Sequence, residues 1–181
     1  MKPFKVLNSD RTAIRRLELR DREKLVELLC NKAVTRHMTF PEEILTEKGV
    51  SDLLETTIGL YESEKPLLSY AVTQDQNNEF IGVSGFTLLE NEEVEIFCAF
   101  LPEYWGKGFA TEVLKKLSDY ILESGNCEAV VAPIARANKA STRAAEKAGF
   151  INLGLLQHPA YDDLVFMFKK TKSGQKDEHH P

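Results

Sequence analysis

Membrane-spanning and secretion signals are missing from this sequence. Its apolar runs fall well short of the roughly 20 residues that cross a bilayer. Residues 1–5, Met-Lys-Pro-Phe-Lys, do not begin the apolar core of a signal peptide. We therefore expect a cytoplasmic protein with no membrane partner.

Cysteine and histidine are scarce and show no metal-binding spacing. The cysteines, Cys30, Cys98 and Cys127, are odd in number and form no C-x-x-C pair. The four histidines show no ligand spacing either. This pattern indicates a reducing compartment and argues against a zinc site, so we expect no metal cofactor.

An excess of positive charge is missing as well. The formal net charge is −5, and lysine and arginine form no basic stripe along the chain. Direct nucleic-acid binding relies on such a stripe, so we expect no nucleic-acid partner. An acidic surface instead favours cationic partners and amine substrates.

What is present is the composition of a globular domain. The 181 residues are 43% hydrophobic and 28% charged, which suits one domain with a hydrophobic core. We expect that domain over residues 1–172 and a disordered polar tail over residues 173–181. The sequence leaves open whether the protein is a monomer or a homodimer.

Hydrophobic periodicity predicts a strand-rich first half and alternating strands and helices later. Residues 1–10 show no strong pattern, and residues 31–41 are interpreted as a connection. Asp21 and Thr46 are predicted to cap the first two helices. This order predicts a mixed sheet with helices on both faces. The predicted strands cover residues 12–19, 67–73, 80–89, 94–101, 127–133, 150–156 and 164–168, and the later helices cover residues 107–124 and 139–148.

The stretch Tyr104–Glu112, Tyr-Trp-Gly-Lys-Gly-Phe-Ala-Thr-Glu, joins a predicted strand to a predicted helix. Gly106 and Gly108 permit a sharp turn, and the helix start offers unpaired N–H groups and a positive dipole end. Such a combination binds phosphate or pyrophosphate. The alternative is a tight strand–helix connection without a ligand.

Two other phosphate-binding patterns are excluded at this turn. A dinucleotide fingerprint needs a third glycine, and the nucleoside-triphosphate loop needs G-x-x-x-x-G-K-[ST]. Neither occurs here. A nucleotide-binding module is therefore a disfavoured alternative.

A second segment, residues 136–150, contains Asn138 and ends Glu-Lys-Ala-Gly-Phe. Together with the glycine turn it resembles the GNAT superfamily of acyl-CoA-dependent N-acyltransferases. Trp105–Ala110 occupy that superfamily's pyrophosphate motif, Gln/Arg-x-x-Gly-x-Gly/Ala, although Trp105 departs from Gln or Arg. The Tyr-Trp-Gly-Lys-Gly turn, the serine three residues after Asn138 and residues 34–40 resemble the ribosomal-protein N-terminal (alanine/serine) acetyltransferase branch.

This resemblance covers roughly residues 11–170 and implies an α+β fold. Its central sheet is mixed, mostly antiparallel and of about seven strands, with helices on both faces. The sheet is splayed between the strands at 94–101 and 127–133, where acetyl-CoA, the acetyl donor, binds. The resemblance implies cofactor binding by Cys98, Phe100, Leu101, Gly106, Lys107, Gly108, Phe109, Ala110, Thr111, Asn138 and Ser141. Asn138 equally suits a helix cap.

Catalysis requires a neutral amine and a protonated leaving thiolate. Many members of the superfamily place a tyrosine where this chain has Ala145, so Ser141 is the replacement candidate, although serine also favours helix starts. Glu95 is the first candidate for the base, although it belongs to an acidic run that a solvated turn would also explain. His37 is the second candidate for the base, because histidine titrates near neutrality, and it is also predicted to contact the acceptor.

The sequence therefore predicts a transferase, an acetyl-CoA-dependent N-acetyltransferase. Its amine acceptor is a protein N-terminal α-amine of the ribosomal-protein type, attacked directly in a ternary complex. Two alternatives stay open: a small-molecule amine acetyltransferase, and a CoA-binding sensor without catalysis.

Overall fold

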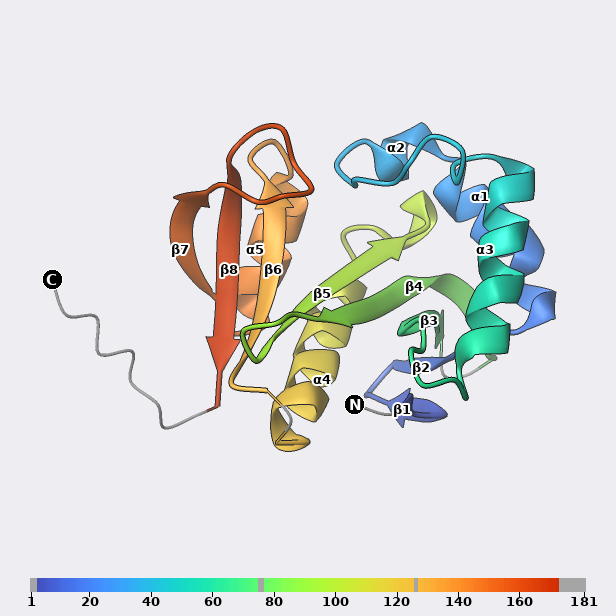
Figure 1. The fold of residues 1–181 in the computed structure, drawn as a ribbon. Helices are drawn as coiled ribbons and strands as arrows, with labels where there is room; N and C mark the ends of the chain where they lie inside the picture. The colour runs from blue at the N-terminus through green and yellow to red at the C-terminus, as the bar shows by residue number, and fades with distance from the viewer. Residues whose placement is uncertain (1–2, 75–76, 126, 173–181) are drawn as a thin grey trace, which may run out of the picture.

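The computed structural model describes residues 3–74, 77–125 and 127–172. The predicted tail over residues 173–181 lies outside these described residues. Figure 1 shows one central sheet with helices on either side of it. None of the described helices is long and apolar enough to span a bilayer.

The sheet has eight strands in the order β1-β2-β3-β4-β5-β6-β8-β7. Every neighbouring pair is antiparallel except β5 and β6, which run parallel. The predicted α+β fold with a mixed, mostly antiparallel sheet is confirmed. The strands are β1 (Val6–Asn8), β2 (Thr12–Arg16), β3 (Ser69–Gln74), β4 (Glu79–Leu88), β5 (Glu93–Phe100), β6 (Ala129–Ala135), β7 (Ile151–Leu156) and β8 (Val165–Thr171).

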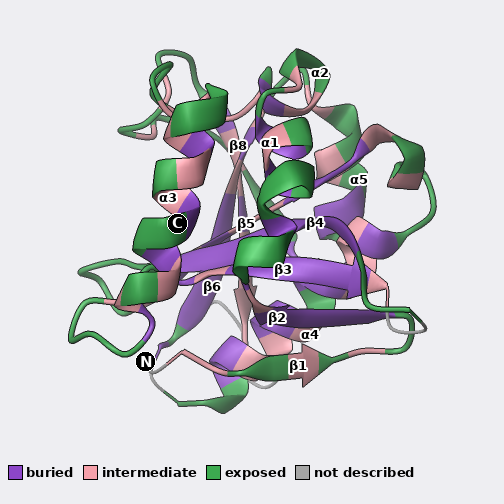
Figure 2. Ribbon diagram, turned by 90° about the vertical axis from the view of Figure 1, so that its right-hand side faces the viewer, coloured by how far each residue is buried: buried purple, intermediate pink, exposed green. Residues whose placement is uncertain are grey.

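Helices cover both faces of the sheet, as predicted. One core cluster joins α4 and α5 to the sheet, and a second joins α1 and α3 to its other face. Figure 2 shows the central strands buried and the outer sides of α1 and α3 exposed. The helices are α1 (Arg22–Leu29), α2 (Lys32–Thr35), α3 (Glu47–Leu60), α4 (Phe109–Glu123) and α5 (Lys139–Lys147).

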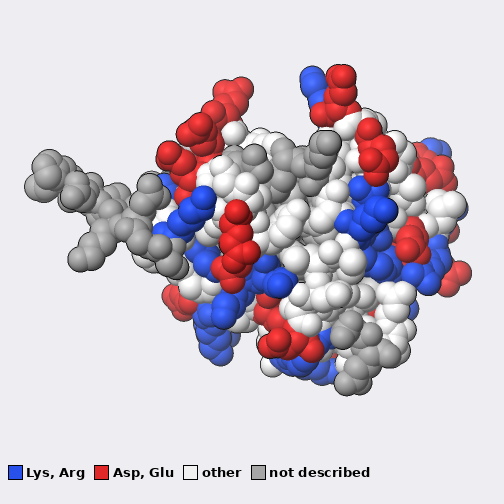
Figure 3. Space-filling view, turned by 90° about the horizontal axis from the view of Figure 1, so that it is seen from below, with Lys and Arg blue, Asp and Glu red and all other residues white. Residues whose placement is uncertain are grey.

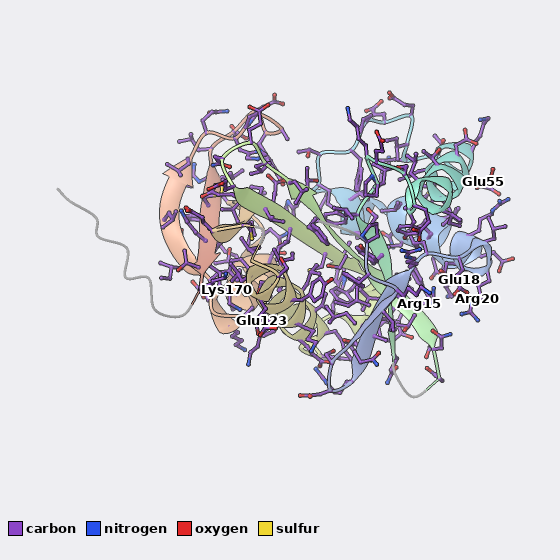
Figure 4. The ribbon with its side chains drawn as sticks, turned by 60° about the horizontal axis from the view of Figure 1, so that its bottom comes forward. Arg15, Glu18, Arg20, Glu55, Glu123 and Lys170 are labelled. Carbon is purple, nitrogen blue, oxygen red and sulfur yellow. The ribbon has the colours of Figure 1, made fainter. Side chains whose placement is uncertain are left out.

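Helix α4 carries the apolar stripe that the sequence predicted. Val113, Leu117 and Ile121 are fully buried against the sheet at helical spacing. Gly125, with φ of 75°, follows its last turn and ends the helix. From β8, Lys170 reaches back toward α4, where its Nζ donates to Asp119 Oδ1 at 2.6 Å and to Ser118 Oγ at 2.9 Å (Figure 4).

The structure differs from three local expectations. Residues 1–10 contain β1, whose side chains are mostly exposed and whose pairing with β2 leaves no hydrophobic pattern in the sequence. The connection over residues 31–41 contains the short helix α2, capped by Asn31. Asp21 is the N-cap residue of α1 as predicted, but its side chain makes no cap bond to that helix; its carboxylate accepts from Arg15, at 2.7 and 2.8 Å, and from Glu18 N, at 2.8 Å. A buried charge-assisted pair of this kind is stronger than a cap bond.

The sheet opens between β5 and β6. Their pairing has only three steps, Glu93 with Ala129, Val94 with Val130 and Glu95 with Val131. Figure 1 shows the two strands close together at their first residues and diverging toward the end of the molecule that carries α2. The second half of β5 therefore faces the opening with one edge of its backbone.

Candidate active site

The turn before α4 has the geometry that binds an anion. Gly106 and Gly108 take φ of 74° and 84°, the left-handed region that favours glycine. The first backbone bond of the helix runs from Glu112 N to Gly108 O, at 3.1 Å, and no side chain caps this end. The N–H groups of residues 109–111 therefore lack intrahelical acceptors and stand at the positive end of the dipole.

The β1–β2 hairpin fixes this turn from behind. Arg11 donates from its guanidinium to Lys107 O at 3.0 Å and to Glu112 Oε2 at 2.8 Å. The other carboxylate oxygen of Glu112 accepts from Ser9 Oγ, Arg11 N and Thr12 Oγ1, at 2.8, 2.9 and 3.1 Å. Burial alone would raise the pKa of Glu112, but these hydrogen bonds outweigh it and lower that pKa. The turn is thus held by a charged network that the sequence pattern did not reveal.

A cavity of about 400 Å³ lies in front of the turn. That volume is within the range of small-molecule sites. Its walls are the segment around α2, the end of β5, the glycine turn and the first turns of α5. The cavity contains most of the predicted site residues: His37, Cys98, Phe100, Gly106, Gly108, Phe109, Ala110, Thr111, Asn138 and Ser141. Leu101, Lys107 and Glu95 lie outside its lining.

The pairing of β5 with β4 decides which backbone groups face the opening. Leu101 N donates to Ile81 O at 3.0 Å, so Leu101 faces β4. In an antiparallel ladder the orientation alternates, so Cys98 and Phe100 face the opposite side, where β6 has diverged. Trp105, half exposed, donates from its indole Nε1 to Phe100 O at 2.7 Å. The cavity-facing backbone of β5 is therefore that of Cys98 and the N–H of Phe100.

Helix α5 supplies the opposite wall. Asn138 caps it by accepting from Ser141 N at 3.2 Å, so the predicted capping role is present. Among the described residues, the structure records no hydrogen-bond partner for Ser141 Oγ. Ala145 is fully buried in the core, so the position where many GNAT enzymes carry tyrosine has no polar group.

Two cationic side chains in this wall were missed by sequence reasoning. Arg143 and Lys147 both line the cavity, one helical turn apart on α5. The sequence signal that could have identified Arg143 and Lys147 is their i, i+4 spacing in the helix that Asn138 begins, because this spacing places both side chains on one helix face. Positive charge opposite the glycine turn suits a ligand that carries phosphates.

Glu95 lies at the vertex of the opening, at the last pair between β5 and β6. Its Oε2 is 2.9 Å from Nε2 of His158, which belongs to the connection between β7 and β8. The prediction that Glu95 might be only a solvated member of an acidic run did not anticipate this partner. Sixty-three positions separate the two residues, so no local pattern connects them.

A second cavity, of about 750 Å³, adjoins the first. It lies between the segment after α2 and the β7–β8 connection, and the two cavities share Arg36, His37 and Met38 as a wall. Burial, and next the charge of Arg36, lower the pKa of His37, so its imidazole is neutral at pH 7. Asp162 and Asp163 lie on the far side of this second cavity.

Charge elsewhere is mixed. On the face seen in Figure 3, the lysine and arginine side chains drawn in colour are interspersed with aspartate and glutamate. Within the described ranges, no three His, Cys, Asp or Glu side chains come together as a metal ion would require.

Comparison with known families identifies the protein class. A model of the acetyltransferase (GNAT) domain matches residues 11–151. The chain belongs to the GNAT acetyltransferases. It is an N-acetyltransferase that uses acetyl-CoA, so the predicted family and reaction class are confirmed.

Curated relatives of this GNAT chain are N-acetyltransferases described as uncharacterized. YoaA of Bacillus subtilis is 29% identical over 162 residues, which cover 88% of this chain and 90% of YoaA. The p20 protein of Bacillus licheniformis is 27% identical over 156 residues, which cover 85% of this chain and 86% of p20. These relatives support the family and leave the acceptor undetermined.

Solved structures agree on the fold at low identity. The ribosomal L7/L12 α-N-protein acetyltransferase RimL, in complex with CoA, gives a TM-score of 0.76 at 18% identity, covering 92% of this chain and 98% of RimL. Spermidine N-acetyltransferase from Vibrio cholerae, in complex with CoA and spermine, gives a TM-score of 0.74 at 19% identity. The match covers 91% of this chain and 98% of that enzyme. At such identity the likeness concerns the fold alone.

Proposed function

We propose that this enzyme transfers the acetyl group of acetyl-CoA to a protein N-terminal α-amine by direct attack in a ternary complex. The observation that carries the proposal is the pair of adjoining cavities. One lies against the glycine turn and the other against the β7–β8 connection, and they share the wall Arg36–Met38. Two substrates bound side by side need such an arrangement.

The first cavity fits the donor. The free N–H groups of residues 109–111 would bind the pyrophosphate, with Arg143 and Lys147 adding charge from the opposite wall. The exposed backbone edge of Cys98 and Phe100 would pair with the amide-containing arm of the donor. That arm would run along β5 toward the vertex of the sheet. This path would place the thioester closer to Glu95 than the pyrophosphate at the glycine turn is.

The acceptor must lose a proton as it attacks. Glu95, at the vertex, would accept that proton from the amine and release it to solvent, and the Ser141 hydroxyl would donate one to the departing thiolate and regain one from solvent. An α-amine has a pKa of about 8, against about 10.4 for lysine, so a single carboxylate deprotonates it more readily. Neutral His37, in the wall shared by both cavities, would contact the acceptor by a hydrogen bond.

The volume and the mixed lining of the second cavity support a polypeptide acceptor. Its volume of about 750 Å³ exceeds that of the first, and its lining mixes charged, polar and apolar residues from three segments. Ribosomal-protein N-terminal acetyltransferases are among the proteins of similar fold. A flexible N-terminus fits such a cavity without the close enclosure that a small ligand needs.

One observation favours a second candidate, a polyamine. Asp162 and Asp163 place two carboxylates at the second cavity, where they would pair with the amines of a polycation, although Arg36, Arg136 and Lys139 line the same cavity. A protein of similar fold is a spermidine N-acetyltransferase, in complex with spermine. A polyamine acceptor would use these carboxylates directly, whereas an N-terminus would not need both.

The test measures CoA thiol release from acetyl-CoA with an acceptor panel. The panel contains peptides with free Ser, Ala or Met N-termini, the same peptides with blocked N-termini, and spermidine. We expect release with free N-termini and none with the blocked ones, whatever lysines they contain. Release with spermidine alone would establish the second candidate. No release with any acceptor, from enzyme that acetyl-CoA stabilises against heat, would overturn the proposal.

A further inference from the structure

The imidazole of His158 makes a different hydrogen bond at each ring nitrogen. Its Nδ1 accepts from the backbone N–H of Ala160, at 3.2 Å. A nitrogen that accepts from an N–H carries no proton, so the proton of the neutral ring is on Nε2. Nε2 lies 2.9 Å from Glu95 Oε2 and therefore donates to that carboxylate. The backbone of the β7–β8 connection thus selects the tautomer that binds Glu95.

The connection around His158 is itself held in place. Tyr161 N donates to His158 O at 3.0 Å, and Gln157 Nε2 donates to Tyr161 O at 3.1 Å. The ring of Tyr161 packs edge-on to the imidazole, with centroids 5.5 Å apart. The side chain of His158 is only 15% exposed, and that of Glu95 is 28% exposed. These contacts leave the imidazole little freedom to rotate away.

The hydrogen bond with His158 engages only one of the two carboxylate oxygens of Glu95. Glu95 Oε2 is taken by His158, while the structure records no hydrogen bond to Oε1 among the described residues. Glu95 is also the last residue of β5 that pairs with β6, so its backbone lies where the sheet begins to open, although neither cavity lining includes it. A carboxylate on an unsupported side chain would sample several rotamers there, at a cost in orientation.

We propose that His158 is a positioning residue that holds Glu95 Oε2 and presents Oε1 to the acceptor amine. This inference rests on the proposed function, in which Glu95 accepts the proton of that amine. His158 does not take the proton itself, because Nε2 already carries one and Nδ1 is engaged by Ala160. Its contribution is the geometry of the base, through the N–H of Nε2.

The kinetic test compares His158→Ala with His158→Gln. Alanine removes the donor, and we expect kcat to fall about 10- to 100-fold, the cost of a misplaced catalytic group. KM for acetyl-CoA and the thermal shift it produces stay unchanged, because neither cavity lining includes His158. Glutamine supplies an amide N–H at a similar reach, and we expect it to restore most of kcat. Gln157→Ala, which loosens the same connection without touching Glu95, serves as the matched control and should lose far less.

A double-mutant cycle separates positioning from general structural damage. In a Glu95→Gln background, His158→Ala should cost little more, since the group it positions is gone. An equal loss of kcat in both backgrounds, or wild-type kcat in His158→Ala, would overturn the inference. If Glu95→Gln keeps wild-type kcat, the assignment of the base fails instead, which is a separate outcome.

A spectroscopic measurement on the wild-type protein needs no folded variant. Long-range 1H–15N spectra of the imidazole distinguish the two neutral tautomers. We expect His158 with its proton on Nε2 and unprotonated Nδ1. A proton on Nδ1 would contradict the proposal regardless of how the variants behave.

Discussion

The donor end and the acceptor end of this site are built in different ways. At the proposed donor end, a strand, a turn and a helix follow one another within residues 94–123, and backbone groups would provide the binding. At the proposed acceptor end, Glu95, His37 and His158 come from three distant segments and would act through their side chains. Backbone sites follow from local rules, whereas side-chain sites depend on which segments meet. We therefore expect variants at the donor end to change acetyl-CoA binding and variants at the acceptor end to change kcat.

The largest expected effect is at the donor end, in Ala110→Glu. A carboxylate beside the free N–H groups of α4 would occupy the position of the pyrophosphate and repel it. Wild type should gain about 2.7 kcal/mol of stability at a hundredfold excess of acetyl-CoA over Kd, and the variant almost none. A thermal-shift titration measures this. Ala110→Gln, similar in size but neutral, is the control; an equal loss there would attribute the effect to bulk.

At the acceptor end, Glu95→Gln should show the opposite signature. Loss of the base should lower kcat about 10²- to 10⁴-fold while the stabilisation by acetyl-CoA persists. Steady-state kinetics and the same thermal titration check both halves of the statement. Glu93→Gln, on the same strand and paired with Lys169, is the control. A variant that lost acetyl-CoA binding as well would remove the distinction between the two ends.

A smaller effect is expected where the hairpin supports the glycine turn. Glu112→Gln weakens its charged bonds, so Kd for acetyl-CoA should rise about 5- to 10-fold, the size of one or two hydrogen bonds. The pKa of Glu112 is lowered in the folded state, so its carboxylate stabilises the fold above its unfolded pKa of about 4.3. That stability is lost as pH falls through the folded pKa.

Urea unfolding at two pH values measures this contribution. At pH 7 the variant should have a lower free energy of unfolding than wild type, and the difference should shrink below about pH 4. A difference that grew at low pH would contradict the lowered pKa of Glu112.

The smallest effect belongs to Arg143→Ala. Its charge is exposed, so we expect acetyl-CoA affinity to fall only about 2- to 5-fold, as for an exposed ion pair of up to about 1 kcal/mol. The loss should diminish as salt rises, because exposed charges are screened. Titrations at low and high ionic strength test this, with the exposed Lys115→Ala of α4 as control. A loss independent of salt would point to a packing role for Arg143.

Sequence reasoning predicted the fold and the glycine turn before α4 because their signals are local. The apolar stripe of α4, the Thr46 cap, and the glycines at 106, 108 and 125 each specify structure within a few residues. Strand β1 escaped because backbone pairing, which any sequence can make, holds it in place. Asp21 stands at the predicted N-cap position but makes no cap bond, because the guanidinium of Arg15 binds its carboxylate.

The hydrogen bond between Glu95 and His158 could not be predicted from the sequence, for a further physical reason. His158 carries no distinguishing pattern around it, and its tautomer depends on one backbone N–H, that of Ala160. The brace of Glu112 by the hairpin likewise joins residues about a hundred positions apart. Only the closure of the sheet determines that these groups meet.

A sheet that opens in its middle exposes an unpaired strand edge, the kind of surface on which foreign strands add and aggregates begin. The indole of Trp105 covers the outer end of that edge by occupying Phe100 O. That carbonyl is therefore already engaged, and an added strand would find one acceptor fewer on this edge. The same side chain that departs from the family motif leaves the cavity-facing N–H of Phe100 to a ligand.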